Sequence, residues 1–123
     1  MNPKFDPATP LFLSIAKWLE DAILAGTYKE EEKVPSTTEI ALSYNLNPAT
    51  ALKGVNMLVS GEILHKKRGL GMYVSKGAVR KLQKKRQGQF YDDYVTPLIS
   101  EANRLQITND DLRDMIENGI AKK

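Results

Sequence analysis

The sequence has no cysteine and a single histidine, His65, among its 123 residues. The absence of cysteine excludes disulfide bonds and thiol catalysis, and it agrees with a reducing cytoplasm, where we expect this chain to work. A zinc site built from histidine and cysteine is also excluded, because zinc takes several such ligands. We therefore expect neither a metal site nor a cofactor.

Long apolar runs and catalytic patterns are missing too. No apolar stretch approaches the roughly 18 residues of a membrane-spanning helix, and the N-terminus lacks the basic and apolar regions of a signal peptide. The carboxylate clusters at 30–32 and 92–93 lie on polar segments that are typical of solvated surface. No serine, histidine and acid arrangement is indicated, so we predict that the chain is not an enzyme and does not enter a membrane.

Acidic residues are absent from the stretch that is richest in basic ones. Residues 66–86 hold 9 of the 18 Lys and Arg residues and no Asp or Glu, although the whole chain has a formal charge of only +3. A concentrated basic block favours binding to phosphates or to an acidic surface. For the charge run taken alone, a solvated face is an equally weighted alternative.

Two helix starts are encoded between residues 34 and 50. Ser36 and Glu39 form the S-x-x-E pattern of a capping box, which predicts a short helix from residue 36. Asn47 followed by Pro48 predicts the N-cap and first residue of the next helix. Gly54 lies inside that helix at a cost of roughly 1 kcal/mol, and we interpret it as the place where a neighbouring helix approaches closely. The residues expected to face the core are Ala51, Leu52, Val55, Leu58 and Val59.

A basic hairpin follows these helices. Strand-like runs at 63–67 and 72–75 flank Arg68-Gly69-Leu70-Gly71, whose glycines permit the positive φ values of a tight turn. Two helices followed by a cationic hairpin are typical of a winged helix-turn-helix. We predict a mainly α fold with a small β-hairpin, with a DNA-binding winged helix-turn-helix at residues 1–76 and a short two-helix extension at residues 77–123.

DNA contacts are expected at both helix starts and on the hairpin. The first residues of a recognition helix reach base edges, so Thr50 suits a thymine methyl or a phosphate and Lys53 a phosphate or guanine. Capping alone is the alternative for Ser36, and a charged surface turn is the alternative for the hairpin. The full set is Ser36, Thr37, Thr38, Asn47, Ala49, Thr50, Lys53, Lys66, Lys67, Arg68, Gly69 and Gly71.

The extension carries a broad apolar stripe at helical spacing, with Pro97 inside it, which predicts a kink or break near 94–96. A stripe this apolar needs a surface to bury against, and a second copy of the chain is the economical answer. A pocket for a small-molecule effector among the aromatic residues is a compatible interpretation. The expected interface residues are Phe90, Tyr91, Tyr94, Val95, Leu98, Ile99, Leu105, Leu112, Met115 and Ile116.

At these motifs the sequence resembles the GntR family of bacterial transcription regulators. The matching segments cover roughly residues 10–75, and the short helical tail is similar to the YtrA-like subfamily. The resemblance implies a homodimer on a palindromic operator of double-stranded DNA, usually as a repressor, often of ABC-transporter genes. The matches are Pro10-Leu11-Phe12, Val34-Pro35-Ser36-Thr37-Thr38-Glu39-Ile40-Ala41, Asn47-Pro48-Ala49-Thr50-Ala51 and Arg68-Gly69-Leu70-Gly71-Met72-Tyr73-Val74.

Two positions depart from the family pattern. Thr38 stands where the family usually has arginine, which predicts weaker affinity or an altered operator. Gly61-Glu62 inverts the usual order before the wing, which predicts a different end to the preceding helix. The alternative from another class is a winged-helix protein-interaction module whose basic block docks on an acidic partner.

Overall fold

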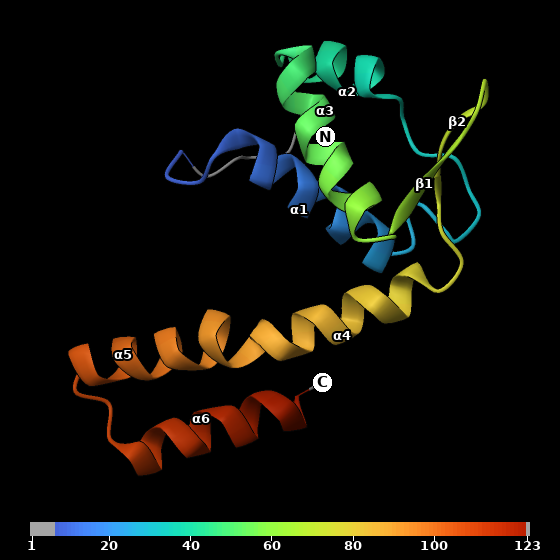
Figure 1. Cartoon of the computed structure of the whole chain (residues 1–123). Helices are drawn as coiled ribbons and strands as arrows, with labels where there is room; N and C mark the ends of the chain where they lie inside the picture. Colours follow the sequence, from blue (N-terminus) through green and yellow to red (C-terminus); the bar gives the residue numbers. More distant parts are fainter. Residues whose placement is uncertain (1–6, 123) are drawn as a thin grey trace. The chain divides into compact units, whose positions relative to one another are not determined.

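Helices make up most of the described chain, and one antiparallel hairpin interrupts them (Figure 1). A computed structural model describes residues 7–122, so the first six residues of the expected N-terminal domain lie outside the description. The predicted mainly α fold with a winged helix-turn-helix is confirmed. The elements are α1 (Leu11–Leu24), α2 (Thr37–Ser43), α3 (Pro48–Ser60), β1 (Leu64–Lys67), β2 (Gly71–Val74), α4 (Ala78–Phe90), a π-helical turn η1 (Tyr91–Val95), α5 (Thr96–Arg104) and α6 (Asn109–Ala121).

The chain forms two compact units that divide between Lys84 and Lys85. The division falls later than the boundary expected after residue 76, because the first turns of α4 belong to the first unit. Ala78 and Leu82 on α4 are completely buried in its core. The assignment of DNA binding to one part of the chain and dimerisation to the other stays a prediction.

Helices α1 and α3 cross in the core of the first unit at Gly54. A Cβ on this glycine would lie 2.8 Å from the carbonyl oxygen of Phe12 and 2.9 Å from Cγ2 of Ile15. The predicted close approach of a neighbouring helix is therefore confirmed, and that helix is α1. Around the crossing, Ile15 and Leu19 of α1 and Val55 of α3 are almost fully buried.

The two predicted helix starts are also confirmed. Ser36 Oγ accepts a hydrogen bond from the Glu39 N–H at 3.0 Å, and the Glu39 carboxylate accepts one from the Ser36 N–H at 3.0 Å. The Asn47 side chain accepts from the Ala49 N–H at 2.8 Å, with Pro48 at the first helical position. Each cap supplies a partner to N–H groups that a helix cannot satisfy internally.

Residues 31–34, which include part of a polar segment expected to be solvated surface, pair with the hairpin. The Val34 N–H donates to the Met72 carbonyl at 3.0 Å, and the Val74 N–H donates to the Glu32 carbonyl at 2.9 Å. Lys33 is thereby bridged in antiparallel fashion to Tyr73 of β2. Residues 31–34 thus act as a short third strand, because the open edge of β2 offers backbone groups that need partners.

The start of α4 is fixed by Glu30, which lies in the loop after α1. Its carboxylate accepts hydrogen bonds from the Gly77 N–H at 2.8 Å and the Val79 N–H at 3.2 Å. These bonds lower the pKa of Glu30, the Gly77 bond contributing most. A residue far upstream therefore caps a helix that the sequence left without a cap.

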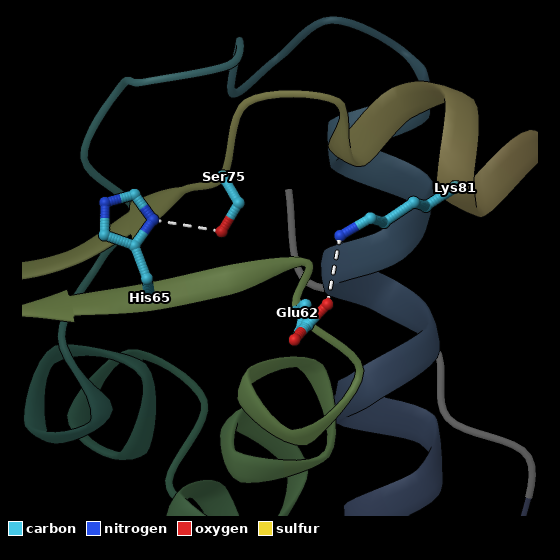
Figure 2. A network of polar contacts seen from close by, with 4 residues as sticks. All are labelled: Glu62, His65, Ser75 and Lys81. Atoms are coloured by element: carbon cyan, nitrogen blue, oxygen red, sulfur yellow. Dashed lines mark hydrogen bonds and ion pairs between the residues drawn. The ribbon is translucent and has the colours of Figure 1, made fainter.

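The inverted Gly-Glu pair lies at the end of α3. The Ile63 N–H donates to the Leu58 carbonyl at 2.9 Å and the Glu62 N–H to the Val59 carbonyl at 3.0 Å, the two bonds of a Schellman motif. This motif places Glu62 in the left-handed region, with φ of 62°. Glycine adopts this conformation freely, whereas a residue with a Cβ is strained by roughly 1–2 kcal/mol. The Glu62 carboxylate accepts a hydrogen bond from Lys81 Nζ at 3.4 Å (Figure 2).

Exchanging the pair, Gly61→Glu with Glu62→Gly, should raise the free energy of unfolding by about 1 kcal/mol. Glycine at position 62 removes the strain, and position 61 has room for a side chain, since its φ is −82° and a Cβ there would lie 3.5 Å from the nearest atom. The lost Glu62–Lys81 ion pair is exposed, so it offsets only a small part of the gain. Urea unfolding measures the change. Glu62→Ala is the control, because it removes the ion pair but keeps the strain, and a swapped chain no more stable than this control would contradict the explanation.

In the second unit, the helical run is irregular close to 94–96, where a kink or break was predicted, but it continues through Pro97 without a break. Residues Tyr91–Val95 form a π-helical turn directly before α5, in which Pro97 lies at the start. A wider turn shifts the hydrogen-bond pattern by one residue, which lets a helix pass a proline that has no N–H to donate. Thr108 caps α6 by accepting from the Asp111 N–H at 3.1 Å. Among residues 7–122, no helix combines the length and apolar character needed to cross a bilayer.

Candidate nucleic-acid interface

The first turn of α3 presents most of the residues expected to read bases. Asn47 and Ala49 are exposed, and Thr50 is half-buried one turn into the helix. The exposed Lys53 holds its Nζ 4.0 Å from the centroid of the Phe12 ring, a cation–π contact with α1. The cap at Asn47 orders this turn, so the side chains that follow it are presented from a fixed backbone.

One residue on this surface was assigned wrongly from the sequence. Leu52 was expected in the core, but it is 45% exposed, and it shares the solvent face of α3 with Ala49, Lys53 and Asn56. The spacing of these residues, i, i+3, i+4 and i+7, places them on a single helix face, but two of them are apolar, so the pattern does not mark this face as exposed. An apolar side chain on this face suits contact with a thymine methyl group.

The start of α2 brings a negative charge close to the predicted phosphate contacts. Thr38 is exposed, whereas Ser36 and Thr37 are half-buried. The pKa of Glu39 is lowered, first by the hydrogen bond from the Ser36 N–H and further by the nearby positive charge of Lys33. The carboxylate is thus held ionised beside Thr38, where a phosphate would meet repulsion unless a cation lies close.

The hairpin, which we call the wing (residues 64–74), carries cations on both of its faces. Leu64 pairs with Val74 and both are buried, so the next residue on that face toward the tip is Lys66, paired with Met72. The opposite face carries Lys67, whose Nζ lies 4.2 Å from the centroid of the Tyr73 ring.

The exposed turn and the cations of the wing lie toward its tip, whereas its base holds a contact between two polar side chains. Arg68 and Gly69 are exposed at the turn, which the Leu70 N–H closes by donating to the Lys67 carbonyl at 2.8 Å. At the base, His65 Nδ1 lies 3.0 Å from Ser75 Oγ, as Figure 2 shows. The cations therefore gather toward the free end of the hairpin.

Lys33, which the sequence left outside the candidate site, lies against the wing. Because it is bridged to Tyr73, it occupies the same face as Tyr73 and Lys67. A Cβ on Gly71 would lie 2.8 Å from Lys33 Cε and 3.6 Å from Lys33 Nζ. No local signal marks this lysine, because its placement depends on strand pairing with a segment about forty residues away.

Most of the remaining cations of the basic block lie on α4, and Lys76 lies just before this helix. Helix α4 begins just after the base of the hairpin, close to where α3 ends; the Ser75 N–H donates to the Ile63 carbonyl at 2.8 Å. The 13 residues of α3 span about 20 Å, so the start of α4 and the first turn of α3 lie at opposite ends of the first unit, as Figure 1 also shows. Arg80 and Lys84 are exposed on α4. The block is continuous in sequence but divided in space.

The apolar stripe expected to form a dimer interface is largely exposed within a single chain. Phe90, Tyr91, Tyr94 and Leu105 are all more than half exposed, and the rings of Phe90 and Tyr94 lie 5.3 Å apart. On α6, Met115 is 56% exposed and Ile116 43%. Val95 and Leu112 are half-buried, and the rest of the set, Leu98 and Ile99, is exposed.

No protein-family model matches the chain. A curated relative, the HTH-type transcriptional repressor YtrA of Bacillus subtilis, is 32% identical over 77 residues, which are 61% of this chain and 59% of that protein. The chain therefore spans less than two thirds of the length of this relative.

Two solved structures resemble nearly the whole chain. A transcriptional regulator of the GntR family from Bacteroides thetaiotaomicron is 30% identical with a TM-score of 0.69, and the match covers 91% of this chain and 97% of that one. A GntR-family transcriptional regulator from Listeria monocytogenes is 26% identical with a TM-score of 0.74, covering 93% and 98%.

Proposed function

The chain belongs to the GntR family of transcriptional regulators, and we propose that it is a sequence-specific DNA-binding regulator, a dimeric repressor acting on a palindromic operator. In this role the chemistry is non-covalent. Lysine and arginine release counterions from phosphates, the first turn of α3 reads bases, and dimer geometry sets half-sites about 10 bp apart or a multiple of it.

One arrangement supports DNA binding above all. The first unit combines the capped, solvent-exposed first turn of α3 with a wing that bears Lys66 on one face and Lys67 on the other. A helix of this kind fits the major groove, and a narrow hairpin with cations on both faces suits a minor groove, which has a phosphate backbone along each wall.

Binding to duplex DNA tests the proposal directly. The intact chain should bind random-sequence duplexes weakly at low salt and genomic fragments that contain its operator much more tightly, with affinity falling steeply as salt rises. Selection of bound genomic fragments would identify the operator, which we expect beside the genes of an ABC transporter. If no duplex binds even at low salt, the protein-interaction module becomes the better interpretation of the basic surface.

Dimerisation through residues 77–123 is the second part of the proposal. Large apolar side chains are exposed on neighbouring turns at Tyr94 and Leu98, and on α6 at Ile116. Such side chains need a partner, and a second copy is the partner always present. We expect sedimentation equilibrium at micromolar concentration to give the mass of two chains. A monomer under these conditions would overturn this part while leaving DNA binding open to its own test.

An effector and a cytoplasmic location complete the proposal. The rings of Phe90, Tyr91 and Tyr94 offer an apolar surface that a small molecule could share with a partner chain. A ligand that binds the folded chain raises its melting temperature, so a screen by thermal shift exposes such an effector. A regulator that binds chromosomal DNA acts in the cytoplasm, which is the location we propose for this protein.

A further inference from the structure

Lys33 lies outside the basic block, yet backbone pairing brings it to the wing. The strand-like segment 31–34 is hydrogen-bonded to β2 on both sides of Lys33, which fixes the position of its backbone. Its side chain is exposed and runs across the outer face of the hairpin beside Gly71. A lysine stem that crosses a backbone in this way delivers its ammonium group at the surface of the wing.

Gly71 makes this path available. Its φ of 120° lies in a region that residues with a Cβ rarely adopt, and the space of a Cβ is taken by the stem of Lys33. A Cβ at this position would lie 2.8 Å from Lys33 Cε, so a larger residue would displace the end of the lysine from its present path.

The position of Lys33 gives the wing a fourth cation on a defined side, in addition to Lys66, Lys67 and Arg68. Lys66 lies on one face of the hairpin, and Lys67 and Lys33 lie on the other. Lys33 also stands close to the first turn of α2, where Glu39 would repel a phosphate and the exposed Thr38 offers no positive charge. A cation between α2 and the wing removes that obstacle to a DNA backbone.

We propose that Lys33 binds a DNA phosphate at the edge of the groove entered by the wing, on the side that faces α2. This inference rests on the proposed DNA-binding function. The contact positions the protein and carries no base preference, as expected for a lysine on a phosphate. Its partner is the DNA backbone and not a free anion, because a single flexible lysine on an open surface holds a phosphate only when neighbouring contacts fix that phosphate in place.

Lys33→Met tests the inference in the intact chain. The methionine keeps an unbranched stem over Gly71 and removes the charge, so the melting temperature should stay unchanged. Affinity for the selected operator and for random duplex should fall alike, by about 3- to 10-fold at 0.15 M salt, and the salt slope should drop by about one. Lys33→Arg keeps the charge and should retain both the affinity and the salt slope of the unaltered chain.

Lys84→Met is the matched control, because it removes the same charge from an exposed site on α4. It should change the salt slope much less than Lys33→Met does. An unchanged slope in Lys33→Met, or equal changes in both variants, overturns the inference while leaving the DNA-binding function intact. If the unaltered chain binds no duplex, the function and the inference fail together.

Neutral methylphosphonate substitutions along the operator locate the contact. One phosphate should matter for the unaltered chain and cease to matter for Lys33→Met, while the phosphates served by Lys66 remain important in both. The same methylphosphonate profile for both chains would contradict a direct contact.

Discussion

Replacing Gly54 by alanine should lower the free energy of unfolding by about 1–2 kcal/mol, although alanine is the better helix former by about 1 kcal/mol. The added Cβ would lie 2.8 Å from the Phe12 carbonyl oxygen, 2.9 Å from Ile15 Cγ2 and 3.0 Å from Ile15 Cβ. These atoms belong to the backbone and to the root of a completely buried side chain, so they cannot move unless α1 shifts away from α3. Overpacking outweighs the helix-propensity gain.

Thermal and urea unfolding measure this effect, and a loss of 1 kcal/mol lowers the melting temperature of a domain this small by several degrees. Gly88→Ala is the control, because Gly88 also lies inside a helix but has nothing within 4 Å of a Cβ. That variant should be slightly more stable than the original chain. If Gly54→Ala lowers the free energy of unfolding and Gly88→Ala raises it, the crossing with α1 is the cause. A Gly54→Ala variant that is more stable than the original chain would disprove the tight crossing.

The double variant Lys66→Ala, Arg68→Ala should weaken binding to every DNA sequence by about 10- to 100-fold at 0.15 M salt and reduce the salt slope by about two. Both side chains are exposed on the wing, so their loss should leave the fold intact. Because phosphate contacts are shared by all sequences, preference among operator variants should be retained. Fluorescence anisotropy across a salt series measures affinity and slope together.

Arg80→Ala with Lys84→Ala is the matched control, since it removes two exposed cations from α4, outside the wing. If the wing makes the contacts, this control keeps most of the affinity and nearly the full salt slope. Equal losses in the two double variants would mean that net charge, and not the wing, governs binding.

Features set by near neighbours in the chain could be predicted from the sequence. The caps at Ser36 and Asn47 join residues two or three positions apart, so a short pattern contains both partners. The glycine turn of the wing is local in the same sense. Gly54 could be interpreted because a glycine that weakens a helix interior needs a reason, and close packing is the commonest one.

Features that depend on partners far away in the chain could not be predicted from the sequence. The run Glu30-Glu31-Glu32-Lys33 has no alternation of apolar and polar residues, so its pairing with β2 leaves no trace in the pattern. Leu52 was placed in the core because apolar residues usually are, and only the three-dimensional crossing of α1 and α3 shows which face of α3 is covered.

The burial of Ala78 and Leu82 bears on how the protein is made. During synthesis a domain folds as a unit once its segments have emerged, and the first unit lacks two fully buried core residues until the start of α4 is available. The Glu30 carboxylate likewise receives its hydrogen bonds only when the backbone N–H groups of Gly77 and Val79 are present. The core of the first unit is therefore completed only when the start of α4 has become available, so this helix is the last part of the unit to join it.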